Sequence, residues 1–88
     1  MLVNEKAFDI IFEALRAANA GVDPPGWLSD AILREDPMLT VDQLGFDSIS
    51  WLEFWISVEL QSGQDLTPGD IEKIQRVTEI IEWLRARL

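Results

Sequence analysis

Residues 48–61 contain eight apolar side chains in a segment of helical length, and this excess is the strongest constraint on the fold. A single core-facing stripe accommodates Leu52, either Phe54 or Trp55, and Val58, with Ile56 as a further candidate. The remaining apolar residues must line an internal cavity or face solvent. Two alternatives follow: the helix exposes an apolar surface that binds a partner, or it is a central helix covered on several sides.

Three further helices are expected from periodicity and end signals. Residues 4–19 have apolar residues at three- and four-residue spacing, between an N-cap at Asn4 and a stop at Gly21. The core-facing residues predicted there are Phe8, Ile11, Phe12, Leu15 and Ala18. Thr67 and Pro68 begin a short helix over 68–74, with Asp70 three residues after the cap. Residues 77–88 form the last helix, whose predicted core face is Val77, Ile80, Ile81 and Leu84.

A long connection over residues 21–46 separates the first two long helices. Turn residues 23–26 open it, and residues 27–33 can form a short helix that ends before Pro37. The residues expected to pack inward are Trp27, Leu28, Ala31 and Ile32 in that helix, and Met38, Leu39, Val41 and Leu44 after it. No alternating β pattern is present. We therefore predict one all-α domain over residues 1–88, with four helices, the third of them short, and a long first loop.

The charge is strongly acidic and unevenly distributed. Sixteen Asp and Glu against seven Lys and Arg give a net charge of −9, and residues 35–72 contain nine acids and no base. Such a surface disfavours nucleic acid and anionic lipid and favours basic protein partners. No secretory signal or apolar stretch of membrane-spanning length is visible, so we expect a cytoplasmic monomer.

Several kinds of chemistry are excluded by composition. The chain has neither His nor Cys, so it lacks a Ser-His-Asp or Cys-His arrangement, a disulfide and a cysteine-based metal site. The acids of residues 65–70 lack the alternation of a calcium loop, and Glu72, Glu79 and Glu82 are expected on a solvated face. We predict no catalytic residues, no bound metal and no enzymatic activity of its own.

The sequence Leu44-Gly45-Phe46-Asp47-Ser48-Ile49 places a serine hydroxyl beside a carboxylate at the start of a helix. The cap is ambiguous: Asp47 or Ser48 fits, and Ser50 with Glu53 fits a capping box two residues later. A serine in this position is most often only a cap. A phosphodiester attached there would also benefit from the positive end of the helix.

These residues resemble the acyl carrier protein family, in which Gly-x-Asp-Ser-[Leu/Ile] opens the second of four helices and the serine carries 4′-phosphopantetheine. Glu53 and Phe54 match the family's acidic and apolar positions, and the similarity covers nearly the whole chain. The resemblance implies a bundle of acyl-carrier-protein type. It implies that a phosphopantetheinyl transferase, with Mg²⁺, moves the arm from coenzyme A to Ser48, which Asp47 flanks. The terminal thiol then holds an acyl or aminoacyl thioester.

The resemblance also implies docking on the second helix. Asp47, Glu53 and Glu59 would attract basic surfaces, with Ile49 and Ile56 as apolar contacts. The partners would be the transferase, a loading ligase or transferase, and downstream biosynthetic enzymes. Two departures, together with fewer acids on the second helix than in carriers of primary metabolism, disfavour ordinary fatty acid synthesis. The motif resembles polyketide-type carriers and the C-terminal half resembles fatty acid carriers, which favours a specialised pathway.

The first departure is the long first loop, and the second is the pair Trp51 and Trp55, where the family has smaller residues beside its cargo cleft. These indoles either reshape the cleft or belong to the core, which we favour for Trp55. Trp27 and Trp83 are also expected in the core. Acyl cargo is favoured over aminoacyl or peptidyl cargo. The alternative of another class is an acidic helical interaction module in which Ser48 is only a cap.

Overall fold

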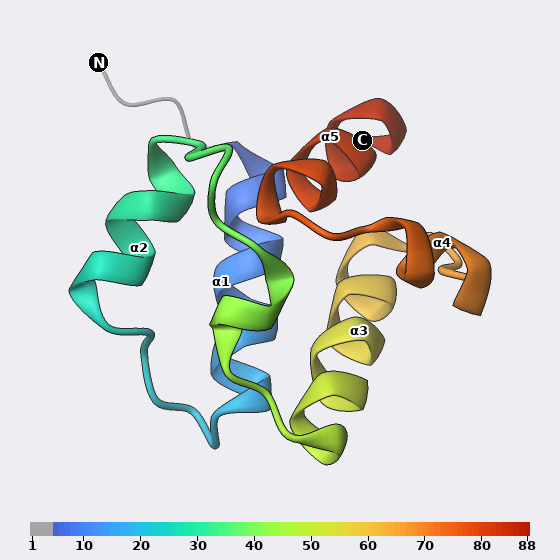
Figure 1. Ribbon diagram of the computed structural model, residues 1–88. Coiled ribbons are helices and arrows are strands. Elements are labelled where there is room, and N and C mark those ends of the chain that lie inside the picture. Colours follow the sequence, from blue (N-terminus) through green and yellow to red (C-terminus); the bar gives the residue numbers. More distant parts are fainter. Residues whose placement is uncertain (1–4) are drawn as a thin grey trace.

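The computed structural model describes residues 5–88, which form α-helices and one 3-10 turn without a strand (Figure 1). The elements are α1 (Lys6–Ala18), α2 (Gly26–Leu33), η1 (Val41–Leu44), α3 (Ser48–Ser62), α4 (Pro68–Lys73) and α5 (Val77–Arg87). The all-α prediction is confirmed. The predicted number of four helices is one too low, because residues 26–33 form the short helix that was considered possible.

Helix α1 forms the centre of the molecule. It packs mainly against α3 and also against α5, and Figure 1 shows α2 on the side of α1 away from α3. Of the five residues predicted to face the core, Ile11, Leu15 and Ala18 are buried, whereas Phe8 and Phe12 are only partly buried. The buried face also includes Ala7, Ile10 and Ala14, which were not predicted. Because several elements surround α1, its buried stripe is wider than the predicted one.

The predicted ends of the helices agree well with the structure. Gly21 has φ +83°, and its N–H donates to the Arg16 carbonyl oxygen (2.8 Å), which ends α1. The Asp70 N–H donates to Thr67 Oγ1 and the Thr67 N–H donates to Asp70 Oδ2, both at 3.1 Å, which confirms the predicted start of α4. The N-cap prediction for Asn4 lies outside the described residues.

All four residues predicted on the core face of α5 are buried, which confirms that prediction: Val77, Ile80, Ile81 and Leu84. An ion-pair network ties this helix to the rest of the chain. Arg85 Nε donates to Glu5 Oε2 (2.8 Å), and Arg85 Nη2 donates to Glu35 Oε2 (3.1 Å). The hydrogen bond from Arg85 holds the pKa of Glu5 below its usual value. The network therefore links the segments that flank α1 and α2 to the C-terminal helix.

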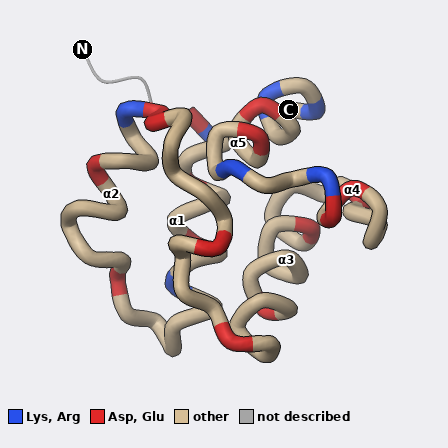
Figure 2. The backbone as a smooth tube through the Cα atoms, viewed as in Figure 1, with Lys and Arg blue, Asp and Glu red and all other residues tan. Residues whose placement is uncertain are grey.

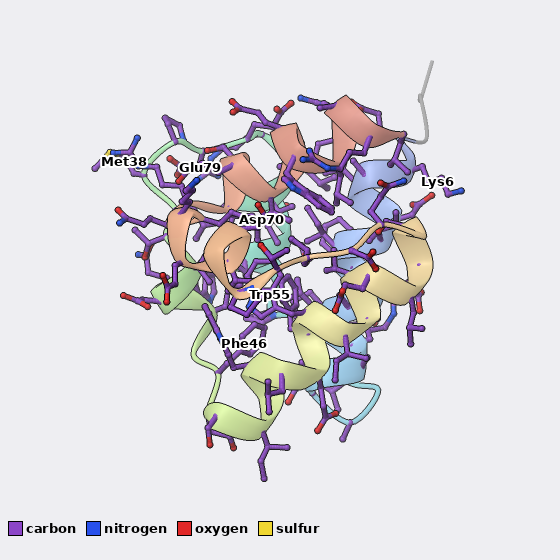
Figure 3. The ribbon with its side chains drawn as sticks, turned by 90° about the vertical axis from the view of Figure 1, so that its right-hand side faces the viewer. Lys6, Met38, Phe46, Trp55, Asp70 and Glu79 are labelled. Atoms are coloured by element: carbon purple, nitrogen blue, oxygen red, sulfur yellow. The ribbon has the colours of Figure 1, made fainter. Side chains whose placement is uncertain are left out.

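Two predicted core residues of the long connection are wrong. Trp27 is exposed, because the buried face of α2 is formed by Leu28, Ala31 and Ile32, which leaves Trp27 on the outer side. Met38 is 77% exposed, and Figure 3 shows it at the edge of the molecule. Met38 follows Pro37 in a turn, and its backbone N–H donates to Asp36 Oδ1 (2.9 Å).

The other anchors of the connection are largely confirmed. Leu39 and Val41 are buried, and Leu44 is partly buried against the core. Backbone hydrogen bonds fix this segment to the α4–α5 turn: the Val41 N–H donates to the Gln75 carbonyl oxygen (2.9 Å), and the Val77 N–H donates to the Leu39 carbonyl oxygen (3.0 Å). The end of the connection is thereby held in place where it leads into α3.

Candidate functional site

The turn before α3 is built by a glycine and an aromatic anchor. Gly45 has φ +74°, a left-handed conformation that an L side chain rarely adopts, and it ends η1. Phe46 then packs on Phe54, with ring centroids 5.1 Å apart. Phe46 is partly buried against the core, whereas Lys6 lies at the edge of the molecule in Figure 3. The residues that follow therefore emerge from a fixed point at the surface.

Asp47 is the N-cap of α3. Its Oδ1 accepts a hydrogen bond from the Ser50 N–H (2.7 Å), and the helix starts at Ser48. Of the alternatives left open by the sequence, Asp47 is therefore the N-cap. Ser48 is not the cap, and the helix does not start with a capping box at Ser50. Ser48 occupies the first helical position and is exposed. Its hydroxyl is therefore accessible at the positive end of a helix of 15 residues.

The electrostatics of this end are set by the cap and by the lack of nearby bases in the sequence. The Ser50 N–H, with the Ser50 hydroxyl and the Ile49 N–H, holds the pKa of Asp47 below its usual value, so the carboxylate is charged at neutral pH. Figure 2 shows acidic but no basic positions along α3. A cationic partner therefore meets no charge repulsion from the side chains of this helix.

The exposed face of α3 carries three of the four predicted partner-binding residues. Ile49, Glu53 and Ile56 are exposed. Glu59 is only partly exposed, and its Oε2 accepts a hydrogen bond from the Leu66 N–H (3.0 Å), so this carboxylate fixes the loop after α3. That structural bond was not predicted, and the docking roles of all four residues stay predictions.

Two predictions about the core face of α3 are wrong. Leu52 and Ile56 are 61% and 52% exposed, whereas Phe54, Trp55 and Val58 are all buried. The contact with α1 and the ring of Phe46 select the face that carries both aromatic residues. The outward apolar residues form what we call the α3 stripe, with spacings of three, four and four residues: Ile49, Leu52, Ile56 and Leu60.

Leu52 and Leu60 were missed as surface residues. Their helical spacing from Ile49 was visible in the sequence, as a second stripe beside the buried one. Of the two alternatives for the excess of apolar residues, the exposed surface is the one found on this face. An apolar surface of this kind, flanked by acids, is typical of interaction sites.

Two of the hollows that adjoin α3 have lining residues in common. The α3–α4 groove has a volume of about 430 Å³ and is lined by Trp51, Leu52, Pro68, Ile71, Glu72 and Ile74. The second hollow, here called the Thr40 pocket, has about 270 Å³ and is lined by Thr40, Val41, Asp42, Trp51, Ile74 and Gln75. Trp51 and Leu52 follow Ser48 by three and four residues. They therefore lie on the same side of the helix, one turn further on.

The four tryptophans differ in their environments. Trp55 is buried, as favoured, and Trp51 is half-buried beside it, with the two rings edge-on and their centroids 5.6 Å apart. Trp83 is only partly buried and lies under the Arg87 guanidinium, 4.2 Å from the ring centroid. The core prediction is thus confirmed for Trp55, only partly met by Trp83 and wrong for Trp27.

The predicted acids are mostly solvated. Glu72 and Glu82 are exposed, while Glu79 is partly buried and accepts from the Arg76 N–H (2.9 Å) at the start of α5. Within residues 5–88, no group of three or more Asp and Glu is arranged to hold a metal ion. None of the helices described for these residues has the length and apolarity that a bilayer crossing requires.

Comparison with known proteins leaves the family open. No protein-family model matches the chain, and no solved structure matches it. Functional assignment therefore depends on the residues and geometry described above.

Proposed function

We propose that this chain is a carrier protein that holds acyl intermediates as thioesters on a 4′-phosphopantetheine arm attached to Ser48. The observation that carries the proposal is the exposed Ser48 at the first position of α3, directly after the Asp47 cap and within Gly45-Phe46-Asp47-Ser48-Ile49. In this proposal α1, α3, α4 and α5 are the four helices of an acyl-carrier-protein bundle. Helix α2 then belongs to the long first loop, and the protein works in the cytoplasm.

The local geometry is compatible with the arm. The phosphodiester would lie at the N-terminal end of α3, where the helix dipole favours negative charge. The Asp47 cap, whose Oδ1 accepts from the Ser50 N–H, fixes the direction in which Ser48 leaves the loop. The bound arm would supply a terminal thiol, which the chain lacks among its own side chains. The protein would thus provide a tether and a surface, and partner enzymes would provide catalysis.

The α3 stripe supports transient docking of those enzymes. Its apolar side chains give contact area, and Asp47 and Glu53 add negative charge in a region of the sequence without a base. Opposite charges across such an interface mainly raise the encounter rate and fix orientation. A carrier that must visit several enzymes needs fast association and fast release. The partners proposed are a phosphopantetheinyl transferase, a loading enzyme and downstream enzymes with basic surfaces.

The α3–α4 groove, one helical turn from Ser48, supports acyl cargo over aminoacyl cargo. Five of the six side chains that line the α3–α4 groove are apolar, the exception being Glu72. An acyl chain gains by leaving water in such a groove, because burial of apolar surface is favourable. An aminoacyl or peptidyl group would use the same tether, but it has less apolar surface to bury against this lining, so its burial is less favourable.

Intact mass analysis tests the attachment. The purified chain is incubated with coenzyme A, Mg²⁺ and a promiscuous phosphopantetheinyl transferase, beside a competent control carrier. Wild type and Ser50→Ala should each gain one phosphopantetheine group, and Ser48→Ala should gain none. Ser50→Ala is the matched control, since it removes the same atom two residues away. An unmodified wild type would refute the carrier function, and an adduct on Ser48→Ala would place the site elsewhere.

A second candidate function is an interaction module without a prosthetic group. The specific observation in its favour is the α3 stripe, which exposes four large apolar side chains on one helix. In that case Ser48 is only the first residue of the helix. The mass experiment separates the two candidates, because this one expects no adduct.

A further inference from the structure

The α3–α4 groove and the Thr40 pocket are separated by two side chains. Trp51 and Ile74 are the residues that line both the α3–α4 groove and the Thr40 pocket, and the other lining residues belong to one hollow alone. Trp51 is the larger of the two and lies on α3, while Ile74 directly follows α4. The wall between the hollows is therefore formed from both sides of the gap between these helices.

This wall is backed by fixed parts of the fold. The Trp51 ring stands edge-on to Trp55, which is buried and in turn edge-on to Phe54, with centroids 5.0 Å apart. The Trp51 indole therefore cannot turn inward without displacing a packed aromatic ring. Ile74 is buried, and its N–H donates to the Ile71 carbonyl oxygen (3.1 Å).

The segments around the Thr40 pocket are held equally firmly. The Val41 N–H donates to the Gln75 carbonyl oxygen (2.9 Å), next to an isolated antiparallel β-bridge between the backbones of Thr40 and Arg76. These bonds prevent the pocket from widening by simple movement of the connection. Access from the groove to the pocket is then controlled by the Trp51 and Ile74 side chains.

We propose that Trp51, together with Ile74, limits the cargo of this carrier to short acyl chains by closing the α3–α4 groove against the Thr40 pocket. The proposal rests on the carrier function proposed above. Trp51 and Leu52 lie one turn from Ser48 on the same side of α3, so an arm that folds back along this side of the helix meets the groove before the Thr40 pocket. A short chain stays within the groove, whereas the end of a long chain stops at Trp51 and remains in water.

The test compares Trp51→Leu with the matched control Trp27→Leu, which makes the same exchange at an exposed tryptophan of α2. Each protein is loaded from butanoyl- and hexadecanoyl-coenzyme A by the promiscuous transferase, and intact mass confirms the adduct. In wild type and Trp27→Leu, the Tm of the hexadecanoyl form should not exceed that of the butanoyl form. In Trp51→Leu it should be higher by about 4 °C or more, because additional methylenes are buried.

A measurement on wild type locates the chain without any substitution. The methyl NMR signals of Val41, inside the Thr40 pocket, should not shift on loading with either acyl group. The Trp51 indole N–H signal should shift with both, to a similar extent.

The outcomes separate this proposal from the carrier function. Absence of an adduct on wild type overturns both. An adduct combined with a shift of the Val41 methyl signals in hexadecanoyl-loaded wild type overturns the role of Trp51 alone. A Tm gain for long chains that is equal in wild type and Trp51→Leu, or absent from Trp51→Leu, does the same.

Discussion

Replacing Phe54 or Leu52 by alanine separates the two faces of α3. Phe54 is 0% exposed, and its ring packs against Phe46 and Trp55 at centroid distances of 5.1 and 5.0 Å. Truncation of a fully buried Phe costs about 3–5 kcal/mol in the free energy of unfolding, because apolar contact is lost and a cavity remains. Leu52 is 61% exposed, so Leu52→Ala should change this free energy by no more than about 0.5 kcal/mol.

Both positions lie inside the same helix, and alanine is the best helix former. Differences in helix propensity therefore cannot explain a larger loss of unfolding free energy for Phe54→Ala than for Leu52→Ala. For a domain of this size, Phe54→Ala should lower Tm by about 12–40 °C, against a few degrees for Leu52→Ala. Urea unfolding followed by circular dichroism measures the free energies directly. If Phe54→Ala is unfolded in water, Phe54→Leu supplies a milder loss on the same face.

Equal losses for the two alanine variants would refute the assignment of faces. So would a cost below about 1 kcal/mol for Phe54→Ala, since such a value is typical of a surface position. The contrast matters for function, because Phe54 also anchors Phe46 in the turn that leads to Ser48.

Three further predictions concern the cap, the start of α4 and the docking surface. The Asp47 carboxyl has a lowered pKa when folded, so its stabilisation is complete above the unfolded-state pKa of about 4 and is lost as pH falls through the folded value. The stability difference between wild type and Asp47→Asn, which still caps, should therefore be constant above about pH 5 and shrink at lower pH; a difference that persists in strong acid contradicts this. Thr67→Ala should lower the free energy of unfolding by about 1 kcal/mol and Thr67→Ser by much less, measured in urea; equal losses would argue against the Thr67 hydroxyl as the cap. Glu53→Lys should slow phosphopantetheine loading far more at low salt than at high salt, and equal slowing would argue against electrostatic steering.

Much of the fold was predictable because local signals agreed with one another. In α5 the apolar residues form one stripe, and all four predicted residues of that stripe are buried. At α4, Thr67 and Asp70 cap each other as the spacing suggested. The turn at Gly21 was visible in the same way. These features depend on residues a few positions apart, so they are written in the local sequence.

The choice between faces of α3 was not predictable from periodicity. Apolar residues occur around much of this helix, so two stripes fit the pattern about equally. Packing against α1 and contact with Phe46 select Phe54, Trp55 and Val58, which are long-range effects. The exposure of Trp27 has a similar origin: the buried face of α2 consists of Leu28, Ala31 and Ile32, so Trp27 lies on the opposite face. The wall at Trp51 depends on Ile74, which lies 23 positions further along the chain.

The division of α3 into two faces also has a functional consequence. The buried residues hold the helix on α1, while Ser48 and the α3 stripe contribute little to the core. Substitutions in the stripe should therefore leave unfolding almost unchanged, so that a loss of loading in such variants reports on docking. If stripe residues proved essential for stability, this separation would fail, and loading defects would have to be read as unfolding. A helix that is anchored on one face can thus expose apolar residues on the other without loosening the fold.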